Sequence, residues 1–384
     1  MRFPEFEEEW NIKTLGSLSK GIGDGIHATP IYDDNGSYYF INGNNLSERG
    51  INISEATKRV SKEEAYKNNA AILNDRTILL SINGTIGNVA LYNNEPIMLG
   101  KSACFINVSP HINKHYVYHY LQTNKCQTYF KSELTGTTIK NLSLQSVRNA
   151  KIALPSIYEQ NRIAKLLDVI DERIATQSKL IEKLESLIKG ISNKLFNSKE
   201  GMPVRLGAVL KERSEKTKVN NQYTVLSSTV NGLFSQREYF SKDIASENNV
   251  GYKIIRLHDV VLSPQNLWMG NINYNDKFDI GIVSPSYKIF FISNNFDKRY
   301  VAAMLKTHRA LYGYKLISEQ GASVVRRNLN LEAFEQLIFK IPTIDKQQEI
   351  GKTISLLNSR LETERTLKAT YQSQKQYLLR QMFI

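Results

Sequence analysis

The second half of this chain repeats the first, and the repeat restricts the possible fold more than any other feature. The segment 154–160 (LPSIYEQ) recurs as 341–347 (IPTIDKQ) at an offset of 187 residues (341 − 154 = 187). The same offset pairs Ile163 with Ile350 and Phe196 with Phe383 without a gap. One period of half the chain predicts two lobes related by a pseudo-twofold axis, because solenoid repeats span only about 20 to 50 residues.

Each repeated segment opens a long stretch that has the apolar spacing of a coiled-coil helix. Its apolar residues alternate in steps of four and three, which is the a/d pattern of a heptad seam. The seam positions are Ile163, Leu167, Ile170, Ile174, Ile181, Leu184 and Ile188 in the first helix, and Ile350, Ile354, Leu357 and Leu361 in the second. We expect the two helices to pair antiparallel within the chain, with Gln177 and Glu364 at equivalent polar positions that fix the register.

The ends of these helices are also marked in the sequence. Ser156 followed by Glu159 has the pattern of a capping box, and Asp345 with Gln348 is the expected cap of the second helix. A stop at Gly201 and Pro203 gives the first helix about 39 residues.

The rest of the sequence alternates short apolar runs with turns rich in Asn, Gly and Ser. We expect strands at 38–42, 77–82, 88–92 and 103–108, and equivalent helices at 114–123 and 298–307. The predicted class is α+β, with a first domain at 1–153, a central helix at 154–200, a second domain at 201–340 and a C-terminal helix at 341–384.

The charge of the chain favours a polyanionic partner. The formal net charge is +13 over 384 residues, which suits nucleic acid or an anionic membrane. Cys104 and Cys126 fit no disulfide or metal pattern, so we expect buried free thiols in a reducing compartment. The absence of an apolar run of about 18 residues and of a signal sequence predicts a soluble, unsecreted protein.

Side chains that can read base edges are frequent in the predicted loops. Asn and Gln pair with adenine and Arg with guanine in the major groove, although Asn is also a common turn residue. The candidates are Asn42, Asn44, Asn45, Arg49, Asn83, Thr85 and Lys101 in the first lobe, and Arg237, Arg256, Gln265, Asn266, Trp268 and Asn271 in the second.

Hydroxyl and basic side chains precede a repeated Asn-Leu pair in both lobes. Such side chains suit phosphate contacts, which position a protein on a duplex without reading its sequence. They are Thr137, Thr138 and Lys140 before Asn141, and Ser323, Arg326 and Arg327 before Asn328.

The sequence contains no convincing catalytic or metal site. His111, His115 and His119 are spaced by four residues, but the glutamate of the HExxH motif is missing, so we expect an exposed helix face. Gly100-Lys101-Ser102 lacks the upstream glycine of a phosphate-binding loop. We therefore predict that this chain does not catalyse a reaction by itself.

Together, the LPSIYEQ and IPTIDKQ segments with their helices, and the loop segments 23–30 (GDGIHATP) and 81–87 (SINGTIG), resemble the specificity subunit of type I restriction-modification systems. Lys346 is a minor departure, since that family often has an acidic residue there. The resemblance covers nearly the whole chain. It implies two target-recognition domains that each read one half of a bipartite double-stranded DNA site, and helices that set the spacing.

The resemblance also implies partners and cofactors. Two methyltransferase subunits would carry S-adenosylmethionine and methylate adenine, and two restriction-translocase subunits would use ATP and magnesium. The chain itself would bind no cofactor or metal and would act in the cytoplasm of a bacterium or archaeon, in phage defence. A coiled-coil adaptor that binds proteins and a nucleic-acid enzyme that acts alone are the alternatives.

Overall fold

The computed structural model of the chain describes residues 2–47, 50–68, 70–136, 140–196, 201–239, 248–320 and 327–383. They form two compact units, of which unit 1 is Met1–Lys179 with Thr366–Ile384 and unit 2 is Leu180–Arg365. Each unit therefore contains one lobe and a segment of both long helices, α5 (Ile157–Phe196) and α11 (Ile344–Gln381).

The central sheet of unit 1 has cores on both of its faces. Its antiparallel strands are, in spatial order, β2 (Ser19–Asp24), β10 (Ala103–Val108), β7 (Thr77–Ser81) and β8 (Val89–Leu91). Because side chains alternate along a strand, Ile78 and Leu80 of β7 lie in the larger core and Leu79 lies in the smaller one. This explains why every residue of β7 is buried.

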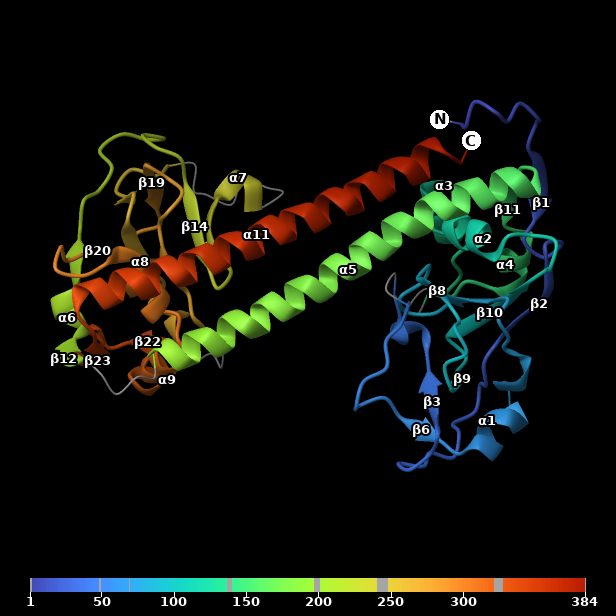
Figure 1. Cartoon of the computed structure of the whole chain (residues 1–384), viewed down its shortest axis with the longest axis horizontal. Helices are drawn as coiled ribbons and strands as arrows, with labels where there is room; N and C mark the ends of the chain where they lie inside the picture. Colours follow the sequence, from blue (N-terminus) through green and yellow to red (C-terminus); the bar gives the residue numbers. More distant parts are fainter. Residues whose placement is uncertain are drawn as a thin grey trace. The chain divides into compact units, whose positions relative to one another are not determined.

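Helices cover the larger core of unit 1, as Figure 1 shows beside the first part of α5. They are α2 (Lys114–Leu121), α3 (Asn124–Ser132) and α4 (Leu144–Asn149). The other strands of unit 1 are β1 (Asn11–Thr14) paired with β11 (Lys151–Leu154), β4 (Leu46–Ser47) paired with β5 (Gly50–Ile51), and the sheet of β6 (Arg59–Val60), β3 (Tyr38–Ile41) and β9 (Ile97–Leu99). Short helices complete the lobe: α1 (Lys62–Asn68), η1 (Gly43–Asn45) and η2 (Ala70–Ile72).

Unit 2 repeats this plan. Its central sheet has the order β13 (Leu210–Arg213), β20 (Lys288–Ile292), β17 (Asp259–Leu262) and β18 (Ile272–Tyr274). The paired strands are β12 (Met202–Arg205) with β23 (Ile338–Ile341), β14 (Leu226–Thr229) with β15 (Gly232–Ser235), β16 (Lys253–Arg256) with β19 (Ile280–Val283), and β21 (Ser318–Gln320) with β22 (Arg327–Leu329). The helices are α6 (Leu206–Val209), α7 (Gln236–Tyr239), η3 (Leu267–Met269), α8 (Lys298–Met304), α9 (His308–Leu316) and α10 (Leu331–Gln336).

The predicted α+β class and the internal repeat are confirmed. The four predicted strands correspond to β3, β7, β8 and β10, and the two predicted helices to α2 and α8. The repeat extends to individual caps: the Asn113 side chain accepts the N–H of Tyr116 in α2, and the Asp297 side chain accepts that of Tyr300 in α8. The two lobes therefore share local hydrogen bonds as well as strand order.

The long helices pair antiparallel within each unit. In unit 1, Lys375 Nζ lies 2.7 Å from Asp171 Oδ1, and the Arg173 guanidinium lies over the ring of Tyr371. In unit 2, Glu185 pairs with Arg365, and later residues of α5 share a core with Ile350 and Ile354 of α11. All the predicted seam residues named above are buried or half-buried, and so are Gln177 and Glu364.

The helix starts differ from the predictions in two details. Ser156 Oγ accepts the N–H of Glu159, but the Glu159 carboxylate turns to Arg2 Nε at 2.8 Å instead of closing a capping box. Since α11 begins at Ile344, Asp345 lies in its first turn and is not its cap. In the part of the chain that the structure describes, no helix is both long and apolar enough to cross a membrane.

Candidate nucleic-acid interface

Three loops of unit 1 that are distant in sequence meet at one edge of the sheets. The unit 1 loop cluster consists of residues 42–46 after β3, 82–88 between β7 and β8, and 100–102 between β9 and β10. Ser102 Oγ accepts the N–H of Gly43 at 2.8 Å and donates to Asn42 Oδ1 at 2.9 Å. Thr85 Oγ1 donates to the carbonyl of Gly43 at 2.9 Å. These bonds fix the loops to one another.

Close approach of these loops depends on two glycines. A Cβ atom at Gly43 would lie 2.3 Å from Ser81 Oγ, and one at Gly100 would lie 2.4 Å from Asn42 Oδ1. Both distances are far shorter than a carbon–oxygen contact allows, so a larger residue would separate the loops. The local backbone therefore positions the predicted side chains.

The cluster also includes the segment that leads into α4. The N–H of Leu142 donates to the carbonyl of Ile82 at 2.9 Å, and Asn83 pairs with Asn141 as an isolated bridge. Lys140 is thereby brought next to the candidates from the other loops. Of the first-lobe candidates that the structure describes, it brings together Asn42, Asn44, Asn45, Asn83, Thr85, Lys101 and Lys140.

The side chains of this cluster have two different roles. Asn42 and Asn45 bond within the loops, since Asn45 Oδ1 accepts the N–H of Asn42 at 3.0 Å and its amide donates to the carbonyl of Asn52. Asn44, Thr85, Lys101 and Lys140 are exposed. Asn42 and Asn45 thus shape the surface on which the exposed polar groups stand.

Unit 2 has a corresponding set of loops. The unit 2 loop cluster consists of residues 263–271 after β17 together with Arg327 at the start of β22. The N–H of Arg327 donates to the carbonyl of Gln265 at 3.1 Å, and the Arg327 guanidinium lies 5.0 Å from the centre of the Trp268 ring. Gln265, Asn266, Trp268 and Arg327 are therefore neighbours, as in the equivalent region of unit 1.

Two other second-lobe candidates lie outside this cluster, and a third, Asn271, lies within it but is turned into the protein. Arg256 is at the opposite end of β17, where its guanidinium forms a two-point ion pair with Glu215. Arg237 is exposed on α7. Asn271 is buried, and its amide is used by Ser228, so the expectation that it faces a ligand is wrong. The candidates Arg49, Thr137, Thr138, Ser323 and Arg326 lie outside the described residues.

The histidines do not form the exposed helical face that their spacing predicts. His111 precedes α2, and His119 is fully buried because its Nε2 bonds to Asp168 of α5 at 2.8 Å. His115 bonds to the same carboxylate. No group of three or more potential His, Cys, Asp or Glu ligands is close enough to hold a metal ion within the described ranges. Cys104 and Cys126 are free and buried, as predicted.

The start of each long helix is anchored to its lobe by a glutamine that the sequence repeat did not single out as functional. Gln160 Oε1 accepts the N–H of Asn113 at 3.0 Å, and its amide donates to the carbonyl of Pro155 at 2.9 Å. Gln347 makes the equivalent two bonds: its Oε1 accepts the N–H of Asp297 at 3.0 Å, and its amide donates to the carbonyl of Pro342 at 2.9 Å. The constant Pro-to-Gln spacing of the two repeated segments is the sequence signal that could have identified these glutamines. These anchors couple each lobe to its helix.

A buried polar network joins α2, α5 and α11 in unit 1. Lys375, which is 5% exposed, donates to Asp171 and to Gln122. Burial lowers the pKa of His119, and the bond to Asp168 opposes this shift only in part. The His119 Nδ1 atom has no hydrogen-bond partner among the described groups, which fits a neutral imidazole that donates through Nε2.

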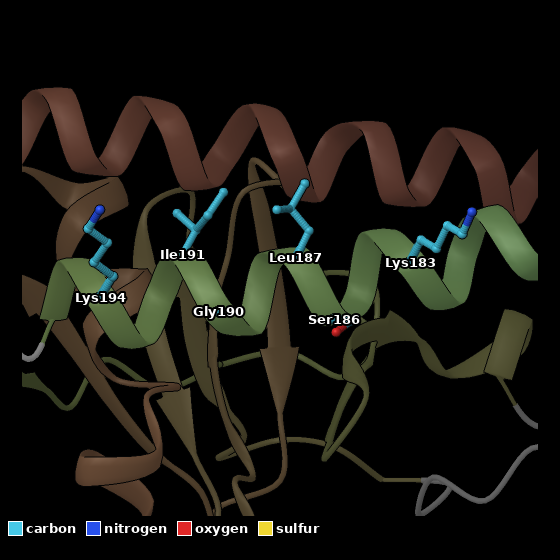
Figure 2. Close-up of a pocket in the computed structure, with 6 residues that line it drawn as sticks. All are labelled: Lys183, Ser186, Leu187, Gly190, Ile191 and Lys194. Carbon is cyan, nitrogen blue, oxygen red and sulfur yellow. The ribbon is translucent and has the colours of Figure 1, made fainter.

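A shallow groove runs along α5 in unit 2. Figure 2 shows Leu187 and Ile191 on the side of α5 that faces α11, with Lys183 and Lys194 at the two ends of the groove. Leu187 is 50% exposed. The lining, completed by Ser186 and Gly190, contains no acid, histidine or cysteine, so it offers no acid–base pair or metal ligand set.

Comparison with known proteins gives a family match for the first part of the chain. Residues 7–186 match the family model described as the type I restriction modification DNA specificity domain. The chain is 28% identical over 196 residues to the type I restriction enzyme MjaVIII specificity subunit of Methanocaldococcus jannaschii, which covers 49% of this chain and 42% of that relative. It is 26% identical over 180 residues to the EcoR124I/EcoR124II specificity subunit of Escherichia coli, in an alignment that covers 44% of this chain and 43% of that relative. The alignments thus span less than half of these relatives.

The whole fold is similar to that of a solved structure. The crystal structure of the type I restriction-modification S subunit from M. genitalium matches with a TM-score of 0.65 at 17% identity, over 100% of this chain and 99% of that chain. At this identity the likeness concerns the fold, and it extends over both units. The resemblance to specificity subunits that the sequence indicated is confirmed.

Proposed function

Because residues 7–186 belong to the type I restriction modification DNA specificity domain family, we propose that this chain is a DNA specificity subunit in which each lobe reads one half of a bipartite site. The observation that carries the proposal is the duplicated loop cluster. In both units, amide and cationic side chains gather where the central sheet ends, on loops that main-chain hydrogen bonds hold in place. Such groups suit base edges and phosphates.

The chain supplies recognition, and its partners supply the chemistry. The methyltransferase subunits would carry S-adenosylmethionine and methylate adenine. Restriction-translocase subunits would use ATP and magnesium.

The long helices would set the spacing between half-sites and dock the methyltransferase subunits. Exposed apolar side chains recur on them at equivalent positions: Val169 and Leu180 on α5 correspond to Leu356 and Leu367 on α11. Solvent-facing apolar groups in a protein often mark a binding surface. Their repetition supports two copies of one partner, which we take to be the methyltransferase subunit. The two restriction-translocase subunits are what the resemblance to specificity subunits implies.

The test is single-molecule sequencing of adenine methylation in cells that contain this chain and the methyltransferase encoded beside it. Cells with the methyltransferase alone are the control. We expect a methylated motif with two separated parts only when the chain is present. If a folded, partnered complex produces no chain-dependent methylation, the protein-binding adaptor becomes the better interpretation.

Binding to duplex DNA gives a second test of the same proposal. Phosphate contacts make the affinity fall steeply with salt, by about 0.9 logarithmic units per tenfold salt increase for each neutralised phosphate. An adaptor with an incidental positive charge would show little duplex affinity even at low salt.

A further inference from the structure

Asn83 and Gln265 occupy equivalent places in the two lobes. The buried strands β7 and β17 carry the repeated runs 78–81 (ILLS) and 260–263 (VVLS), which correspond in the sheet order of the two units. Each amide residue lies two positions after the serine of its run, Ser81 or Ser263. The duplication has therefore placed a side-chain amide at the same exit from the central sheet in both units.

Main-chain hydrogen bonds to other segments hold the backbone around both residues. In unit 1 the carbonyl of Ile82 accepts the N–H of Leu142 at 2.9 Å, and the N–H of Ile82 donates to Ser102 at 3.0 Å. In unit 2 the carbonyl of Gln265 accepts the N–H of Arg327 at 3.1 Å. A side chain on such a fixed backbone loses less entropy when it binds than one on a free loop.

The two amides differ from the structural amides around them. Asn42, Asn45 and Asn88 in unit 1 use their side chains inside the protein, and so do Asn271 and Asn273 in unit 2. In contrast, no hydrogen bond involves the side chain of Asn83 or Gln265 in the part of the chain that the structure describes. Both keep a donor and an acceptor for a ligand.

Each lobe also has a cationic side chain at an equivalent position. Lys140 and Arg327 are equivalent at the offset of the long-helix repeat (327 − 140 = 187), and each lies on the segment that pairs with the amide loop. Lys140 is exposed, and Arg327 is partly exposed above Trp268. Each lobe thus presents one free amide and one cation in a matching arrangement.

We propose that Asn83 and Gln265 are the equivalent base-reading residues of the two lobes, each pairing with an adenine edge in one half-site, while Lys140 and Arg327 contact neighbouring phosphates. The adenine assignment follows from chemistry, since the side-chain NH2 of the amide donates to adenine N7 and its oxygen accepts from the adenine N6 amino group, which forms the bidentate pair that is specific to adenine in the major groove. This inference rests on the proposed function and specifies the residues that carry it.

The test uses the complex of the chain with its methyltransferase subunits. Once the wild-type motif is known, Asn83→Ala and Gln265→Ala are compared by methylation sequencing and by competition between duplexes that differ at one base pair. We expect each variant to lose discrimination by about tenfold or more at one adenine, in its own half-site only. Gln372→Ala, an exposed amide on α11, is the control that should leave the motif unchanged.

Lys140→Ala separates base reading from phosphate contact. We expect weaker binding to every duplex and a salt slope that is smaller by about one, with the motif retained. The inference is overturned if Asn83→Ala and Gln265→Ala leave the motif intact, relax both half-sites, or weaken all duplexes equally. A wild-type complex without any bipartite motif would instead overturn the proposed function.

Discussion

The two units share a strand order, yet they join their lobes to the long helices with different chemistry. In unit 1 the junction contains Lys375, Asp171, His119 and Asp168 in a buried polar network. In unit 2 the sequence repeat places Ala303 where His119 stands, and the Lys375 position corresponds to Ile188 (375 − 188 = 187). The duplication kept the backbone plan, and the two junctions diverged in polarity. A buried polar network tolerates fewer alternative arrangements than an apolar contact, so unit 1 has the more specific junction.

The largest difference should come from two equivalent phenylalanines, Phe196 at the end of α5 and Phe383 just beyond the end of α11. Phe383 packs on the rings of Tyr116 and Tyr120 at 5.3 and 5.4 Å, whereas its equivalent Phe196 contacts one ring among the described residues, that of Tyr300 at 5.3 Å. Phe383→Ala should lower the free energy of unfolding of unit 1 by about 4 kcal/mol, as for other buried aromatic truncations. Phe196→Ala should cost unit 2 less, because Phe196 is only half-buried.

The chain offers a probe for each unit, since its two tryptophans are Trp10 in unit 1 and Trp268 in unit 2. Urea unfolding of Trp268→Phe and Trp10→Phe backgrounds therefore reports the two units separately. Equal losses from the two phenylalanine variants would contradict the difference between the junctions.

The next effect concerns the buried cation. Lys375→Ala leaves Asp171 without its cation and should destabilise unit 1 by about 3 kcal/mol, the usual consequence of breaking a buried ion pair. Arg365→Ala is the matched control in unit 2, because its pair with Glu185 is about half exposed on both sides, at 48% and 46%. Such an exposed pair contributes less than about 1 kcal/mol. Similar urea midpoints for the two variants would show that the network contributes little.

The glutamine anchors should behave alike in the two units. Gln160→Ala and Gln347→Ala each remove two hydrogen bonds and leave one main-chain N–H unpaired, so each should cost its unit about 2 kcal/mol. Hydrogen exchange at the starts of α2 and α8 is the measurement, with exposed Gln348→Ala as control. A large inequality between the anchors would show that the units differ beyond the polar network.

The smallest effect should be a pH dependence confined to unit 1. Burial lowers the pKa of His119, so the unfolded chain binds a proton more readily and acid favours unfolding below about pH 6.5. Desolvation raises the pKa of Asp168, but its hydrogen bonds to His115 and His119 lower that pKa by more. Protonation of Asp168 below about pH 4 should therefore lower the free energy of unfolding further. Asp171 and Lys375 complete the charged groups that face His119.

Unfolding midpoints of both single-tryptophan backgrounds between pH 5 and 8 would measure this dependence. His119→Gln should remove the decrease in the stability of unit 1 between about pH 6.5 and pH 5. If the loss persists in that variant, another group is responsible.

Local sequence patterns predicted much of the fold because helices and strands have their own periods. The heptad spacing indicated α5 and α11, and the apolar run at 103–108 matches the bounds of β10. The candidate loop residues were also suggested by type, since amides and cations recur in both halves. These features depend on neighbours within a few residues.

Contacts between distant residues could not be predicted in this way. Glu159 had the pattern of a cap, but Arg2 competes for its carboxylate from 157 residues away. His119 looked exposed because its partner Asp168 is 49 residues away on another helix. Ser102 organises the unit 1 loop cluster through its bonds to Asn42 and Gly43. The residues next to Ser102 in the sequence give no sign of these distant partners.

Unit 1 combines an early and a late segment of the chain, so its synthesis is completed after that of unit 2. Unit 2 is one continuous stretch, but unit 1 needs Leu378, Leu379, Met382 and Phe383 in its core. A ribosome adds these residues only after all of unit 2, so the lobe that is synthesised first is completed last. Until then, Tyr116 and Tyr120 lack their aromatic partner Phe383. The nascent chain therefore carries an open apolar surface, of the kind that chaperones bind, for as long as unit 2 takes to be translated.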